Sequence, residues 1–104
     1  MSTRSLSYSV YHAALLDYML GSGESGLATA YELGRTGFDA GYGLLHVLHV
    51  HERAVNTILE STPAGDEVLR RVDASTNFLA EALSAFEMAY RGYRAFLQAP
   101  GDKR

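Results

Sequence analysis

The feature that most limits the fold is one segment, residues 66–98, where apolar side chains recur at helical spacing with no proline. One apolar row comprises Val68, Val72, Leu79, Leu83, Phe86, Tyr90, Tyr93 and Leu97. A second row comprises Leu69, Phe78, Ala82, Ala85, Ala89 and Phe96. Steps of three and four residues place side chains on one face of an α-helix. The pattern predicts a helix about 50 Å long, at 1.5 Å per residue.

Three shorter helices are expected before this one. They cover Leu6–Leu20, Ser25–Thr36 and Leu44–Glu60. A glycine-rich stretch at residues 21–26 ends the first helix, and residues 37–43 are expected to form a break after the second. Residues 61–65 form the last turn before the long helix. A chain of 104 residues with this pattern fits one all-α, four-helix bundle-like domain over residues 1–104. We expect order over about 6–98 and a polar tail at 99–104.

The helix spacing also predicts which side chains face the core. The first helix would bury Tyr8, Tyr11, Leu15 and Tyr18; the second, Leu27, Ala30, Tyr31 and Gly34; the third, Leu44, Leu48, Val55, Ile58 and Leu59. Two adjacent apolar rows on the long helix exceed what three shorter helices can cover. We therefore expect a homodimer, with Leu79, Leu83, Phe86, Tyr90 and Tyr93 serving the core or the subunit contact.

Composition argues against several classes of function. The net charge is −3 and Lys103 is the single lysine, so no basic face for nucleic acid is expected. No apolar run is long enough to span a membrane, and residues 1–10 lack the apolar core of a signal peptide. The absence of cysteine is compatible with a cytoplasmic location and rules out thiolate metal sites.

A cluster of histidines is the one candidate for metal or ligand chemistry. His46 and His49 share a helix face, whereas His51 falls near the apolar face, where one hydrogen bond at the edge of the core would satisfy it. A metal needs further ligands that the sequence does not supply nearby. No Glu-x-x-His or Gly-x-Ser-x-Gly motif occurs. We expect no enzyme activity, no cofactor and no metal. The alternative is a helical sensor domain that binds a metal or a ligand through His46, His49 and His51.

Three segments carry a resemblance to a known family. They are residues 78–93, 27–35 and 48–55; the first contains a Phe-Leu-x-Glu run followed by Phe-Glu-Met-Ala-Tyr-x-Gly-Tyr. Together they resemble the N-terminal domain of the phosphoserine phosphatase RsbU, a stress sigma-factor regulator, from Tyr8 to Leu97. His51 falls at a histidine that recurs in the family.

The resemblance implies an all-helical dimer that binds protein partners. In such proteins the domain recruits a switch protein kinase similar to RsbT and so regulates a phosphatase; the same domain also precedes histidine kinases. We expect a free-standing relative or an N-terminal piece of a longer protein. The candidate partner-binding residues, expected to be exposed or half-exposed, are Tyr31, Arg35, His51, Glu87, Arg91 and Arg94.

Overall fold

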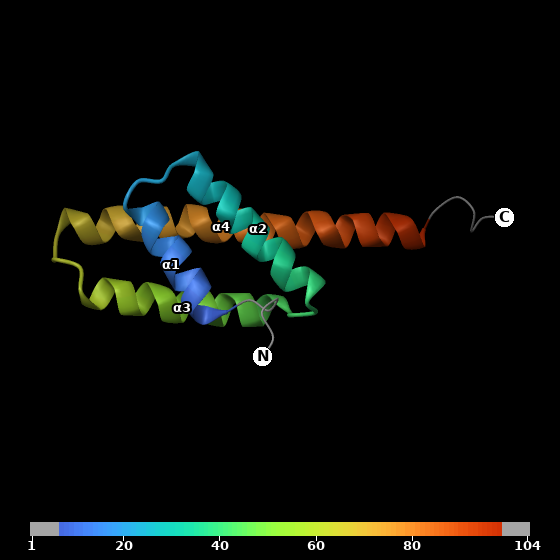
Figure 1. The fold of residues 1–104 in the computed structure, drawn as a ribbon, viewed down its shortest axis with the longest axis horizontal. Coiled ribbons are helices and arrows are strands. Elements are labelled where there is room, and N and C mark those ends of the chain that lie inside the picture. Colours follow the sequence, from blue (N-terminus) through green and yellow to red (C-terminus); the bar gives the residue numbers. More distant parts are fainter. Residues whose placement is uncertain (1–6, 99–104) are drawn as a thin grey trace.

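The computed structural model describes residues 7–98, and within that range it contains four α-helices and no strand (Figure 1). The helices are α1 (Tyr8–Met19), α2 (Glu24–Asp39), α3 (Leu44–Glu60) and α4 (Asp66–Leu97). The expected all-α, bundle-like fold with a long last helix is therefore confirmed. The expected start of the first helix at Leu6 and the tail at 99–104 lie outside the described residues.

The helices are arranged around the longest one. α3 lies beside α4, to which it is joined by the turn at residues 61–65, while α1 and α2 cross this pair obliquely (Figure 1). α4 has 32 residues, and its C-terminal end extends past the other three helices. The molecule is consequently elongated, with extents of 61 × 31 × 22 Å.

The end of α2 differs from the sequence prediction. α2 continues through Gly37 to Asp39, although residues 37–43 were expected to form a break. The chain leaves the helix at Gly41, where φ is +88°, and the N–H of Tyr42 donates to the carbonyl oxygen of Gly37 at 2.9 Å. The N–H of Gly41 also donates to Phe38, which completes a Schellman motif. The end of α2 thus depends on one glycine in the left-handed conformation, Gly41, rather than on the number of glycines in residues 37–43.

The core lies where α1, α2, α3 and the middle of α4 meet. Its buried apolar members are Tyr11, Leu15, Ala30, Val47, Val50, Ala54, Ile58, Phe78 and Phe86. The ring of Tyr11 packs edge-to-face on Phe78 with centroids 5.3 Å apart. Aromatic pairs prefer this geometry because the positive edge of one ring meets the negative face of the other.

The buried face of α3 also differs from the prediction. Val47, Val50 and Ala54 point inward, whereas Leu44 and Leu48 are exposed. α3 carries apolar residues on more than one side, so helical spacing identified several possible faces and did not determine which one meets the core. Leu44 instead lines an apolar groove.

α2 and α4 approach each other closely at Gly34. α2 turns its small residues inward, namely Gly26, Ala30, Gly34 and Gly37. A Cβ added at Gly34 would overlap the backbone carbonyl of Ala82 on α4. The missing side chain therefore allows the two backbones to touch, and this contact sets the position of α2 along α4.

Replacing Gly34 with alanine should destabilise the fold by about 1–3 kcal/mol, because the new methyl group meets backbone that cannot move aside cheaply. Gly92 on α4 provides a matched control, since a Cβ there meets nothing within 4 Å. Gly92→Ala should stabilise by about 0.5–1 kcal/mol through helix propensity alone. Urea unfolding followed by circular dichroism measures both; equal stabilisation by the two substitutions would contradict the close contact.

Candidate functional site

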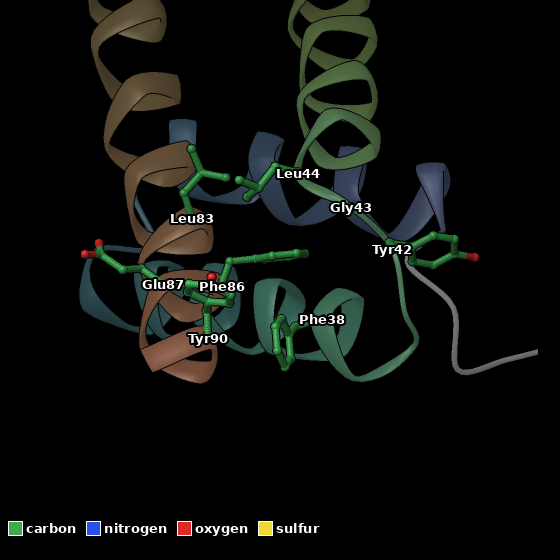
Figure 2. A pocket seen from close by; sticks show the side chains of 8 residues that line it. All are labelled: Phe38, Tyr42, Gly43, Leu44, Leu83, Phe86, Glu87 and Tyr90. Atoms are coloured by element: carbon green, nitrogen blue, oxygen red, sulfur yellow. The ribbon is translucent and has the colours of Figure 1, made fainter. Parts of the chain in front are cut away.

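An apolar groove lies where α2 ends and α3 begins, facing α4 (Figure 2). Its volume is about 540 Å³. The residues that line it are Phe38, Tyr42, Gly43, Leu44, Leu83, Phe86, Glu87 and Tyr90. Figure 2 shows Leu44 and Phe86 reaching into the space between the helices, whereas the carboxylate of Glu87 points outward from α4. The floor of the groove is therefore apolar, and its charge lies at the rim.

Local structure explains why the groove stays open. The Schellman motif that ends α2 turns the chain at Gly41, and α3 begins only at Leu44. Phe38 and Phe86 pack edge-to-face, with centroids 5.7 Å apart and planes at 89°. This pair joins α2 to α4 beneath the opening. Leu44, in the first turn of α3, remains 51% exposed, so the described chain covers only about half of it.

A charged surface adjoins the groove on α4. It lines a second hollow that shares Glu87 and Tyr90 with the groove and adds Arg91, Arg94, Ala95 and Gln98. Glu87 and Arg91 form an ion pair at 2.6 Å, and the guanidinium of Arg94 lies 5.9 Å from the Tyr90 ring centroid. Among residues 7–98, no carboxylate pairs with Arg94. The rim thus carries one arginine whose charge is not matched by a carboxylate in the described part of the chain.

The predicted partner-binding residues fall into three places. Glu87, Arg91 and Arg94 gather at the second hollow. Tyr31 is half-buried on α2, and Arg35 lies one turn further on, paired with Asp39 at 3.3 Å; neither residue lines the groove or the second hollow. The structure therefore brings together the α4 candidates but leaves those of α2 outside this site.

His51 is not exposed as a partner contact would require. Its side chain is buried, with 8% of the residue exposed, and the Tyr11 hydroxyl lies 2.7 Å from its Nδ1. The rings of Tyr11 and His51 meet edge-to-face. This is the single hydrogen bond at the core that the sequence had suggested. The expectation that His51 would be exposed or half-exposed is corrected, because the face of α3 that contains it turns inward.

The residues expected to serve the core or a subunit contact divide along α4. Phe86 is buried, and Leu79 and Leu83 are partly buried against the core. Tyr90 and Tyr93 are more than half exposed, and every described residue of the chain from 90 onward is exposed. The apolar row thus changes from core to surface within two turns.

The histidine cluster does not form a metal site in the part of the chain that the structure describes. His46 stacks on Tyr42 with centroids 4.2 Å apart, His49 is exposed and His51 is buried. Among residues 7–98, no group of three or more His, Asp or Glu side chains is placed to hold a metal ion. In the same range, no helix is both long and apolar enough to cross a bilayer.

Comparison with known families now adds to this geometry. The family described as phosphoserine phosphatase RsbU, N-terminal domain, matches residues 9–89, which are 81 of the 104 residues. The chain belongs to this family. No curated protein sequence and no solved structure matches it.

Membership of the RsbU N-terminal domain family confirms the resemblance inferred from the three segments. The family is one of regulatory domains in stress sigma-factor signalling, the N-terminal part of a phosphatase rather than its catalytic part. The match ends at residue 89, so Arg91 and Arg94 lie just beyond it.

Sequence reasoning missed Phe38, Tyr42 and Gly43 as parts of a site, and it assigned Leu44 to the core. A signal was available in the spacing, because Leu44, Leu45 and Leu48 occupy a side of α3 different from that of Val47, Val50 and Ala54. That second apolar side was the evidence for a surface in this RsbU N-terminal domain. Its position opposite Phe86 required the tertiary structure.

Burial lowers the pKa of His51 below its ordinary value. The folded RsbU N-terminal domain therefore favours neutral His51, whereas the unfolded chain binds a proton near pH 6.5. The free energy of unfolding should fall as the pH drops from 7.5 to 5. We expect a smaller fall in His51→Gln and an unchanged fall in His49→Gln, where the side chain is exposed. Urea titrations at both pH values measure this; identical pH dependence in all three proteins would contradict it.

Proposed function

We propose that this chain is a protein-docking and dimerisation module of bacterial partner-switching signalling, working in the cytoplasm without catalytic activity of its own. Its partner is a switch protein kinase of the RsbT type. Docking regulates a phosphatase or a histidine kinase, either attached or separate. The observation that carries the proposal is the family match over residues 9–89.

The surface of α4 supports docking at Glu87, Arg91 and Arg94. These exposed charges border an apolar groove, and protein interfaces commonly combine a buried apolar centre with a polar rim. Arginine and tyrosine are also the residues on which binding energy tends to concentrate. The arrangement gives a partner both apolar contact area and charged groups that select orientation.

Regulation follows from binding linkage. A partner that binds one arrangement of the domain more tightly than another shifts the population toward that arrangement. α4 provides a physical connection, since its end projects beyond the bundle and is continuous with the docking surface. A change in the packing of this end alters the conformational equilibrium of a module joined to α4.

The exposed end of α4 supports a homodimer. Tyr93, Phe96 and Leu97 are each more than half exposed, and Phe96 reaches 76%. Apolar side chains clustered on an exposed surface mark interaction sites in proteins of this size. A second copy that packs against this end covers surface that the described part of one chain does not.

Kinase docking is tested by measuring binding of an RsbT-type kinase to variants of α4. Glu87→Ala and Arg91→Ala should each weaken binding about tenfold, equivalent to about 1.4 kcal/mol. Arg70→Ala is the control, because Arg70 is also an exposed, ion-paired arginine of α4 but lies near its start. Unchanged affinity in both variants would remove these two positions from the interface.

Dimerisation is tested by sedimentation equilibrium at micromolar concentrations. The unmodified chain should sediment as a dimer, whereas Tyr93→Glu and Phe96→Glu should shift it toward monomer, since each places a charge in an apolar contact. Leu69→Glu is the matched control, an exposed leucine at the opposite end of α4. A monomeric unmodified chain with intact helix content would refute the dimer.

A further inference from the structure

The apolar groove raises a question that docking through surface charges does not answer, namely what occupies it. Leu44 and Tyr90 at its mouth are about half exposed, and the described chain offers nothing to cover them. A volume of about 540 Å³ lies within the range of sites that hold apolar ligands or the anchor side chains of a partner. The shape and polarity of the groove restrict the choice.

The lining favours a helix over an extended peptide. Phe38, Leu83 and Phe86 form the floor, and they offer no hydrogen bond to a backbone N–H or C=O. An extended peptide would bury its backbone groups unsatisfied there, which is costly. Residues 7–98 also contain no strand edge to which such a peptide could add. A helix satisfies its own backbone and needs only apolar anchors at steps of three and four residues.

Charge at the rim favours an acidic occupant. Arg94 borders the groove beside Tyr90 and is not paired with a carboxylate of residues 7–98, whereas Arg91 is neutralised by Glu87. On the other side, Gly43 is the N-cap of α3 and makes no side-chain cap hydrogen bond, and the first turn of α3 contains no acidic residue. The helix N-terminus adds partial positive charge there. Both rims therefore attract negative charge.

The same charge argues against a second copy of this chain in the groove. A two-fold contact brings identical patches together, and in this patch the carboxylate of Glu87 already pairs with Arg91. Among residues 7–98, a second copy therefore brings no unpaired carboxylate of this patch to Arg94. A partner with carboxylates along one edge of its helix supplies that charge.

We propose that the groove bounded by Phe38, Leu44, Phe86 and Tyr90 holds an amphipathic helix of a protein partner, whose acidic edge faces Arg94. The apolar anchors of that helix fill the groove between the start of α3 and α4. The inference rests on the proposed docking function and specifies the partner chemistry at that site. It also assigns a role in partner binding to Leu44 and Phe38, whereas docking through surface charges alone would not involve these two residues.

The probe is a pair of synthetic helical peptides of about 15 residues, or four turns. Both carry leucine and phenylalanine at steps of three and four; one has glutamate along an edge, and the other has lysine at the same positions. Fluorescence anisotropy with the full chain should show the acidic peptide binding at least tenfold tighter at low salt. The difference should shrink as salt screens the rim charges.

Neighbouring leucines provide a matched pair of variants. Leu44→Glu should weaken the acidic peptide at least tenfold, whereas Leu45→Glu should not, because Leu45 is 68% exposed and does not line the groove. Arg94→Glu should reverse the preference so that the lysine peptide binds more tightly. Both leucines are exposed, so circular dichroism should show the same helix content in the two variants.

Several results would overturn the inference. These are no saturable binding up to about 1 mM peptide, equal affinity for the two peptides, or equal effects of the two leucine substitutions. Conversion of a dimer to a monomer by Leu44→Glu alone would assign the groove to a second copy and likewise overturn it.

The two proposals fail in different ways. If the kinase binds but neither peptide does, the groove inference fails and the docking function stands. If the acidic peptide binds as expected but no kinase does, the kinase-docking function fails and the groove inference stands. Competition of the acidic peptide with the kinase supports both.

Discussion

The contact between the backbones of α2 and α4 at Gly34 and Ala82 determines much of the remaining structure. Because Gly34 has no side chain, α2 rests directly on α4 at this point. One helical turn further along each helix, Phe38 and Phe86 meet edge-to-face. The crossing therefore positions the aromatic pair beneath the groove, and the glycine stop after α2 then returns the chain so that Leu44 faces the same space. The fold and the candidate site depend on one close approach.

α4 has different tasks along its length. Its middle contributes Phe78, Ala82 and Phe86 to the core, whereas residues 90–98 are all exposed. The groove lies at the boundary between these two parts. A molecule that binds there contacts both the packed domain and the projecting helix. Membership of the RsbU N-terminal domain family gives this geometry its biological setting.

The buried pair of Tyr11 and His51 supports the opposite side of the core. Their 2.7 Å contact satisfies two polar groups where an unpaired one would be costly, and it links α1 to α3. Burial raises the pKa of Tyr11 and lowers that of His51, so both side chains stay neutral in the fold. His51 therefore has a structural role in this chain.

The sequence alone determined the helix content, the long last helix and the family, because helical periodicity and motif residues are local properties of the chain. It also identified Glu87, Arg91 and Arg94 as surface charges of α4, although their role as partner contacts is still a prediction. The inward face of α3, the end of α2 and the groove came only from the tertiary structure. The physical reason is that an apolar residue such as Leu44 has the same periodicity whether it is buried or exposed. Whether Leu44 is buried or exposed depends on the position of α2, which contacts α4 at Gly34 and is followed by the turn at Gly41.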